Sequence, residues 1–135
     1  MILLTTKELI QKQFIEEYEK KEYTRITVKE LCANTPVART TFYSYYQNIN
    51  DVKEDTENNL ITGIMEIAVK LSKGNMPEMD FSLFLSETMG YIKNHWHEIY
   101  VFLIVQPNVR FILKWKEAIK KHFLLRFPQK EKAPN

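Results

Sequence analysis

Glycine occupies only three of the 135 positions of this chain, and this scarcity constrains the fold more than any other single feature. Tight turns between strands commonly need glycine, because it reaches positive φ angles without a steric penalty. Leu, Ile, Glu and Lys instead recur at the spacings of amphipathic helices. Hydrophobic residues make up 44% of the chain, and its length matches one ordinary domain. The sequence therefore predicts an all-α protein with a buried core.

Seven helices are expected, because apolar residues at helical spacing alternate with polar or proline breakers. They cover residues 6–20, 27–33, 38–46, 50–72, 81–94, 96–105 and 107–127. Two capping boxes, Thr5 with Glu8 and Thr27 with Glu30, mark the first two starts. In such a box each side chain bonds the backbone N–H of the other residue, which satisfies two orphan donors.

Two domains are expected. Residues 1–50 form a three-helix head, and residues 51–128 form a small helical body that a long linking helix begins. Asn50 is the expected cap of that helix, and Pro107 is the expected first residue of the last helix. Residues 129–135 are predicted to be a disordered tail.

Residues 27–46 have the pattern of two short helices joined by a tight turn, with Arg, Thr and Tyr crowding the second. Phe42 and Tyr46 are four residues apart and can point inward together, which leaves a polar face outward. A helix-turn-helix reads DNA by placing such a second helix in the major groove. Thr27 can offer its hydroxyl to a phosphate, and Arg39 can reach either guanine or a phosphate.

The segments ITVKELC and VARTTFYSYYQNINDV resemble the DNA-binding head of TetR-type transcriptional repressors over residues 6–65. The residues in the matching places are Thr27, Val37, Thr41, Phe42, Tyr43, Tyr45 and Tyr46. The resemblance implies a homodimer that places two heads on a palindromic operator in double-stranded DNA. The implied DNA contacts are Thr27, Val28 through its amide, Lys29, Arg39, Thr40, Thr41, Tyr43 and Tyr45.

Three residues depart from the family pattern. Pro36 replaces a glycine of the turn, Ala38 replaces a serine that caps the third helix, and Ile49 replaces a lysine that contacts phosphate. The chain also ends after about seven helices, whereas the family dimerises through two further ones. Either the body is abbreviated, or the chain is a fragment, or it dimerises in another way. Residues 1–53 hold 8 Lys and Arg against 7 Asp and Glu, a net charge of only +1. Affinity for DNA is therefore expected to depend on placed contacts and on two copies of the head.

The body is rich in aromatic residues, and the resemblance implies that a ligand bound there moves the long helix and respaces the two heads. We expect a small apolar or aromatic effector. The candidate lining residues are Phe84, Tyr91, Trp96, Tyr100, Phe111 and Trp115. The alternative is that these side chains form plain core or a dimer interface, because aromatic residues at helical spacing do so more often.

An enzyme is not expected, because the chain has neither a glycine-rich phosphate loop nor a nucleophile–base pattern. No cofactor or metal is expected either, since His95 and His97 are two apart and point to different faces of a helix. Cys32, the single cysteine, is expected in the core. Without a disulfide, signal peptide or apolar span, the chain is predicted to be cytoplasmic with no membrane partner. The competing hypothesis is a helical protein-interaction module that has the repressor fold but binds no operator.

Overall fold

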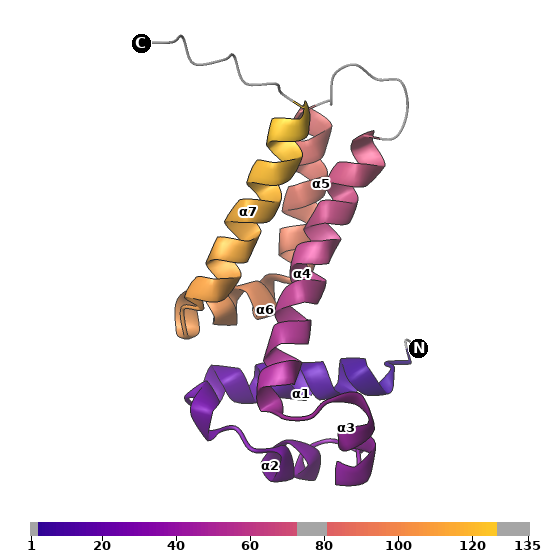
Figure 1. The fold of residues 1–135 in the computed structure, drawn as a ribbon, viewed down its shortest axis with the longest axis vertical. Helices are drawn as coiled ribbons and strands as arrows, with labels where there is room; N and C mark the ends of the chain where they lie inside the picture. Colours follow the sequence, from indigo (N-terminus) through magenta and orange to yellow (C-terminus); the bar gives the residue numbers. More distant parts are fainter. Residues whose placement is uncertain (1–2, 73–80, 127–135) are drawn as a thin grey trace. The chain divides into compact units, whose positions relative to one another are not determined.

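The computed structural model describes residues 3–72 and 81–126, and every regular element in these two stretches is a helix (Figure 1). The elements are α1 (Thr6–Lys20), the 3-10 turn η1 (Tyr23–Arg25), α2 (Val28–Ala33), α3 (Arg39–Tyr45), α4 (Ile49–Ser72), α5 (Phe81–Asn94), α6 (Trp96–Tyr100), the π-helical turn η2 (Val101–Val105) and α7 (Val109–Arg126). The all-α prediction is confirmed. The predicted loop at 73–80 and the predicted tail at 129–135 lie outside the described residues.

The chain divides into two compact units. Unit 1 comprises Met1–Asn59 and His97–Asn108, and unit 2 comprises Leu60–Trp96 and Val109–Asn135. The first part of α4 and the segment 97–108 thus belong with the N-terminal helices. The predicted division at residue 50 groups these residues differently, and it stays a prediction about domains.

Threonine side chains cap the N-termini of α1 and α2. The Thr5 hydroxyl accepts from the Glu8 N–H at 3.2 Å, and the Thr5 N–H donates to the Glu8 carboxylate at 3.4 Å, so the first predicted capping box is confirmed. The Thr27 hydroxyl likewise accepts from the Glu30 N–H at 3.1 Å. The Glu30 carboxylate pairs with Lys21 Nζ instead of reaching back. The second half of the second predicted box is therefore wrong, because a cation beyond α1 offers that carboxylate a charged partner.

The long helix α4 begins at Ile49, so the prediction that Asn50 caps it is wrong. The side-chain oxygen of Asn48 accepts from the Asp51 N–H at 2.9 Å and acts as the cap. The Asp51 carboxylate accepts from the Gln47 N–H at 3.0 Å. These two bonds order the residues that lead from α3 into α4.

The predicted helix 96–105 is present as α6 followed by the π-helical turn η2. The last helix begins at Val109 and not at Pro107 as predicted. The reason is that the Asn108 N–H bonds the Phe102 carbonyl at 2.8 Å. That bond continues the wide turn of η2 past Pro107, so regular helix can start only afterwards.

Unit 1 has an aromatic core between α1 and η2. Phe14 and Phe102 are fully buried, and the Tyr18 ring lies between them, 5.6 Å from Phe14 and 5.0 Å from Phe102 between centroids. Burying each such side chain contributes about 1.5–3 kcal/mol. This packing joins residues more than 80 positions apart in the sequence.

In unit 2, Ala68 of α4 and Phe84 of α5 form a buried cluster. The Tyr91 hydroxyl of α5 donates to the Leu60 carbonyl of α4 at 2.8 Å. A Cβ at Gly63 would overlap the Tyr91 ring, so the absence of a side chain there allows this close approach.

Candidate functional site

The helices α2 and α3 pack together in unit 1 and are joined by residues 34–38 (Figure 1). Leu31 of α2 is fully buried, and Val37 in the connection is 6% exposed, so both help to hold the pair together. Ala38 precedes α3 without a side-chain cap, which agrees with the missing serine noted in the sequence.

The short helix α3 has one buried face and one exposed face. Phe42 is fully buried and Tyr46 is 5% exposed, and their rings lie 5.8 Å apart. Tyr43 and Tyr45 are about half exposed, at 52% and 47%. The prediction of which aromatic residues point inward is therefore confirmed, and the outward face is polar and aromatic.

The residues predicted to contact DNA lie on α2, on α3 or directly before α2. Seven of them are exposed: Thr27, Lys29, Arg39, Thr40, Thr41, Tyr43 and Tyr45. Val28 is half-buried, but its predicted contact is through the backbone amide, so burial of the side chain does not bear on it. Thr27 uses its hydroxyl as the cap of α2, which orients it at the start of that helix.

A polar network beneath α3 was not foreseen from the sequence. The Tyr46 hydroxyl donates to the Asp55 carboxylate of α4 at 2.6 Å. The Gln11 amide of α1 donates to that carboxylate at 3.0 Å and to the Tyr46 hydroxyl at 2.9 Å. Burial, and then the bond to Asp55, raise the pKa of the Tyr46 phenol, so it remains a donor. The network ties the end of α3 to both neighbouring helices.

Cys32 is half-buried and less enclosed than the predicted core position. The short helix α2 packs inward mainly through its neighbour Leu31, which leaves the adjacent residue at the edge. Burial raises the pKa of the Cys32 thiol above its usual value, and Arg39 opposes this shift. The neutral thiol is therefore favoured, which lowers its reactivity.

The six aromatic residues proposed to line an effector site differ in their surroundings. Phe84 is buried in the α4–α5 cluster, and fully buried Phe111 packs edge-on against Trp115 with centroids 5.4 Å apart. Tyr91 lies 4.4 Å from the His95 ring, and Trp96 is 52% exposed. Tyr100 is half-buried and belongs to unit 1, whereas the other five belong to unit 2. Core packing accounts for the burial of Phe84 and Phe111 without a ligand.

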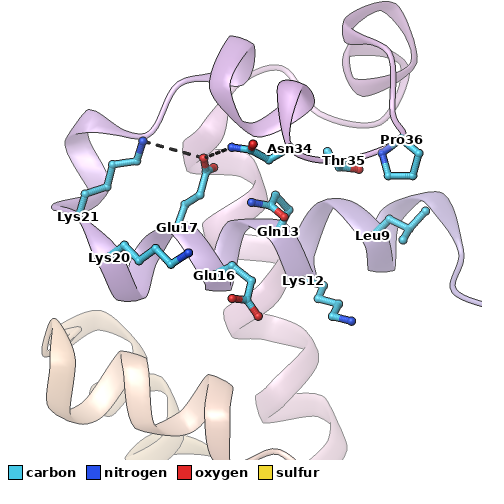
Figure 2. Close-up of a pocket in the computed structure, with 10 residues that line it drawn as sticks. All are labelled: Leu9, Lys12, Gln13, Glu16, Glu17, Lys20, Lys21, Asn34, Thr35 and Pro36. Atoms are coloured by element: carbon cyan, nitrogen blue, oxygen red, sulfur yellow. Dashed lines mark hydrogen bonds and ion pairs between the residues drawn. The ribbon is translucent and has the colours of Figure 1, made fainter.

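A hollow of about 690 Å³ lies in unit 1 between α1 and the connection after α2. Figure 2 shows the ten residues that line it. Its lining residues are Leu9, Lys12, Gln13, Glu16, Glu17, Lys20, Lys21, Asn34, Thr35 and Pro36. None of the six predicted aromatic residues is among them. Eight of these ten residues are polar or charged, whereas the pockets that usually hold small molecules are lined mainly by apolar side chains.

Glu17 is the most enclosed charged group of this hollow, at 6% exposure. One carboxylate oxygen accepts from the Asn34 amide at 3.4 Å and lies 3.9 Å from Lys21 Nζ (Figure 2). The other oxygen makes no hydrogen bond to any residue that the structure describes. Burial raises the pKa of Glu17, and Lys21 and Asn34 only partly oppose that rise. The α1–α2 contact therefore contains a carboxylate that is poorly compensated when it is charged.

His97 Nε2 lies 2.6 Å from the Glu19 carboxylate, so this histidine connects the segment 97–108 to α1 within unit 1. Within residues 3–72 and 81–126, no group of three His, Cys, Asp or Glu side chains could hold a metal ion. In the same part of the chain, no helix is both long and apolar enough to cross a bilayer.

No protein-family model, curated protein or solved structure matches this chain. The resemblance of residues 6–65 to TetR-type heads consequently rests on the order and spacing of the residues themselves.

Proposed function

We propose that this protein is a sequence-specific DNA-binding regulator of transcription, acting as a homodimeric TetR-type repressor in the cytoplasm. The observation that carries the proposal is the two-sided character of α3. Phe42 and Tyr46 anchor it to the core, while Arg39, Thr40 and Tyr43 are exposed beside one another. A short, firmly seated helix with a polar outer face meets the requirements for entering the major groove.

The outward residues suit different parts of DNA. Arg39 at the start of α3 can donate in a fork to guanine O6 and N7, a contact that contributes about 1–3 kcal/mol of base discrimination. Thr40 and Thr41 can contact thymine methyl groups or accept and donate hydrogen bonds. The hydroxyls of Tyr43 and Tyr45 suit phosphate oxygens, which position the head without reading sequence.

Charge favours two heads over one. Unit 1 contains 8 Lys and Arg against 11 Asp and Glu, a net charge of −3, although residues 27–46 contain two cations and one carboxylate. Because non-specific binding depends on neutralised phosphates, one head is expected to bind DNA weakly. Two heads on a palindrome add their contacts, and their Tyr43 residues would lie about 34–36 Å apart, one turn of DNA. A small apolar or aromatic effector that changes this spacing would release the repressor.

Gel shifts on the DNA upstream of the protein's own gene test the proposal. Wild type, Arg39→Ala and Tyr43→Phe are compared, with Lys70→Gln as a control that removes an exposed cation from unit 2. Arg39→Ala should weaken specific binding by about tenfold or more, as expected for loss of one base contact. Tyr43→Phe should lower affinity more evenly across sequences, and Lys70→Gln should bind like wild type. Wild-type binding no stronger than to random DNA at every salt concentration would refute the proposal.

A helical protein-interaction module is the second candidate. The net charge of unit 1 and the presence of Ile49 at the start of α4, where a lysine would contact phosphate, favour it. Size-exclusion chromatography with light scattering separates the two. A monomer at micromolar concentration supports the module, whereas a dimer agrees with a palindrome-binding repressor.

A further inference from the structure

The segment 97–108 is part of unit 1 although it follows α3 by more than 50 residues. Ile99, Val101 and Phe102 in this segment are essentially fully buried. His97 pairs with Glu19 at one end, as described above. The other end is held by a denser set of hydrogen bonds around one side chain, Gln106.

Gln106 caps the C-terminal end of α1 from a distant part of the sequence. Its amide nitrogen donates to the Tyr18 carbonyl at 2.6 Å and to the Lys21 carbonyl at 2.5 Å. Its amide oxygen accepts from the Tyr23 N–H at 3.1 Å. The last carbonyls of a helix have no partner within the helix, so this side chain satisfies groups that α1 itself leaves open.

The backbone of Gln106 is held as well. Its carbonyl accepts from the Tyr18 hydroxyl at 3.0 Å. Burial, and then the nearby Glu57 carboxylate, raise the pKa of Tyr18 to about 12, so the phenol keeps its proton. Four hydrogen bonds therefore join Gln106 to residues 18–23, and both groups of its side-chain amide are used.

The position of Gln106 depends on the wide turn that precedes it. Its N–H bonds the Val101 carbonyl at 3.0 Å, five residues back, where a regular helix would bond four residues back. A π-helical turn thus contains one residue more than an α-helical turn. Such turns occur mostly as single-turn insertions in α-helices, and they are frequent at functional sites. Closing it to α-helical register would rotate Gln106 by about 100° around the helix axis, the angle of one residue. The amide would then leave the end of α1.

We propose that η2 and Gln106 form a register latch on the DNA-reading head. In the π-helical register Gln106 holds the end of α1, and in the α-helical register it withdraws. A less firmly held α1 also weakens the support of α3, because Gln11 on α1 hydrogen-bonds both Asp55 and Tyr46 at the end of α3. The latch is a property of unit 1, and only its consequence for operator affinity rests on the proposed function.

Hydrogen–deuterium exchange on the full chain tests the latch directly. Gln106→Leu keeps a similar volume and removes the side-chain hydrogen bonds, and Gln13→Leu is the matched control on half-buried Gln13 of α1. Amides of residues 18–23 and 27–46 should exchange about tenfold faster in Gln106→Leu, because several hydrogen bonds are lost there. The amides of α5 and α7 should be unchanged, whereas general destabilisation would accelerate exchange in both units. If Gln106→Leu exchanges like Gln13→Leu over residues 18–46, the latch is refuted.

Two further variants test the register and the donor. Deleting Ile104, which is 60% exposed, removes the extra residue of the turn. Gln106 then stands four positions after Val101, so an α-helical turn leaves its amide at the end of α1. The deletion should slow exchange across residues 97–108. Faster exchange there would refute the proposal that η2 has two registers. Gln106→Glu keeps the acceptor for Tyr23 but loses both donors, so it should behave like Gln106→Leu; wild-type exchange in it would overturn the capping role.

Operator binding is measured on the same variants. Gln106→Leu should bind specific DNA about tenfold more weakly than Gln13→Leu, if the head is loosened by the lost bonds. A wild-type protein without specific binding refutes the proposed function but leaves the exchange result to decide the latch. Specific binding with equal affinity in both variants retains the function and refutes the effect of the latch on it.

Discussion

Lys53 is the residue whose removal tests the buried electrostatics of unit 1 most directly. Its Nζ lies 3.0 Å from a carboxylate oxygen of Glu57, whose side chain is 1% exposed. The same oxygen accepts from the Asn108 amide at 2.6 Å. Lys53 Nζ also lies 4.9 Å from the centre of the Tyr23 ring. Lys53→Met keeps the aliphatic stem and removes the charge.

The expected cost follows from the burial of the pair. Removing one partner of a buried ion pair costs about 3–5 kcal/mol, because the remaining charge stays buried and loses its counter-charge. The Lys53 side chain keeps 13% exposure, so the lower end applies. Loss of the cation–π contact adds about 0.5–1 kcal/mol. With a urea dependence of about 1.5 kcal/mol per molar, the combined loss of about 3.5–4 kcal/mol lowers the unfolding midpoint by about 2.5 M.

Urea denaturation followed by far-UV circular dichroism measures this shift. Lys12→Met on the exposed side of α1 is the control, and its stability should change by no more than about 0.5 kcal/mol. The double variant Lys53→Met/Glu57→Met should recover part of the loss, because the buried negative charge is removed together with the cation. A midpoint for Lys53→Met equal to that of Lys12→Met would refute the reasoning that this pair stabilises unit 1.

Three smaller predictions use the same denaturation assay. Thr5→Ala removes the capping box of α1 and should cost about 1 kcal/mol, whereas Thr24→Ala in exposed η1 should change little. Ala38→Ser supplies the side-chain cap that α3 lacks and should raise the free energy of unfolding by about 0.5–1 kcal/mol. An unchanged free energy of unfolding would mean that the missing cap does not destabilise α3. Glu17 has a raised pKa, so the folded state holds its proton more tightly, and wild-type stability should fall as pH rises above 4.5 through the raised pKa. Glu17→Gln should flatten that fall and gain stability relative to wild type near neutral pH, whereas parallel pH profiles would contradict the assignment.

Local features of this protein follow from its sequence. The bounds of α1 and its capping box were predicted, because both depend on residues within four positions of one another. The inward direction of Phe42 and Tyr46 was predicted as well, since residues four apart lie on the same face of a helix. Near misses also occurred locally: Asn48 and Asn50 are both good caps, and the sequence does not say which one the packing of α3 selects.

Contacts between distant residues were decided only in the tertiary structure. The Glu30 carboxylate pairs with Lys21 across the turn, although its spacing from Thr27 allows a capping box. Gln106 bonds Tyr18 and Lys21 from 85–88 positions away, so no periodic pattern announces its role. The helical period repeats every few residues. It therefore predicts the face on which each side chain lies, but not the distant residue that the side chain contacts. The exposed face of residues 27–46 can therefore be predicted from the sequence. The hydrogen-bond network of Tyr46, Asp55 and Gln11 and the capping of α1 by Gln106 form only when the distant segments pack together.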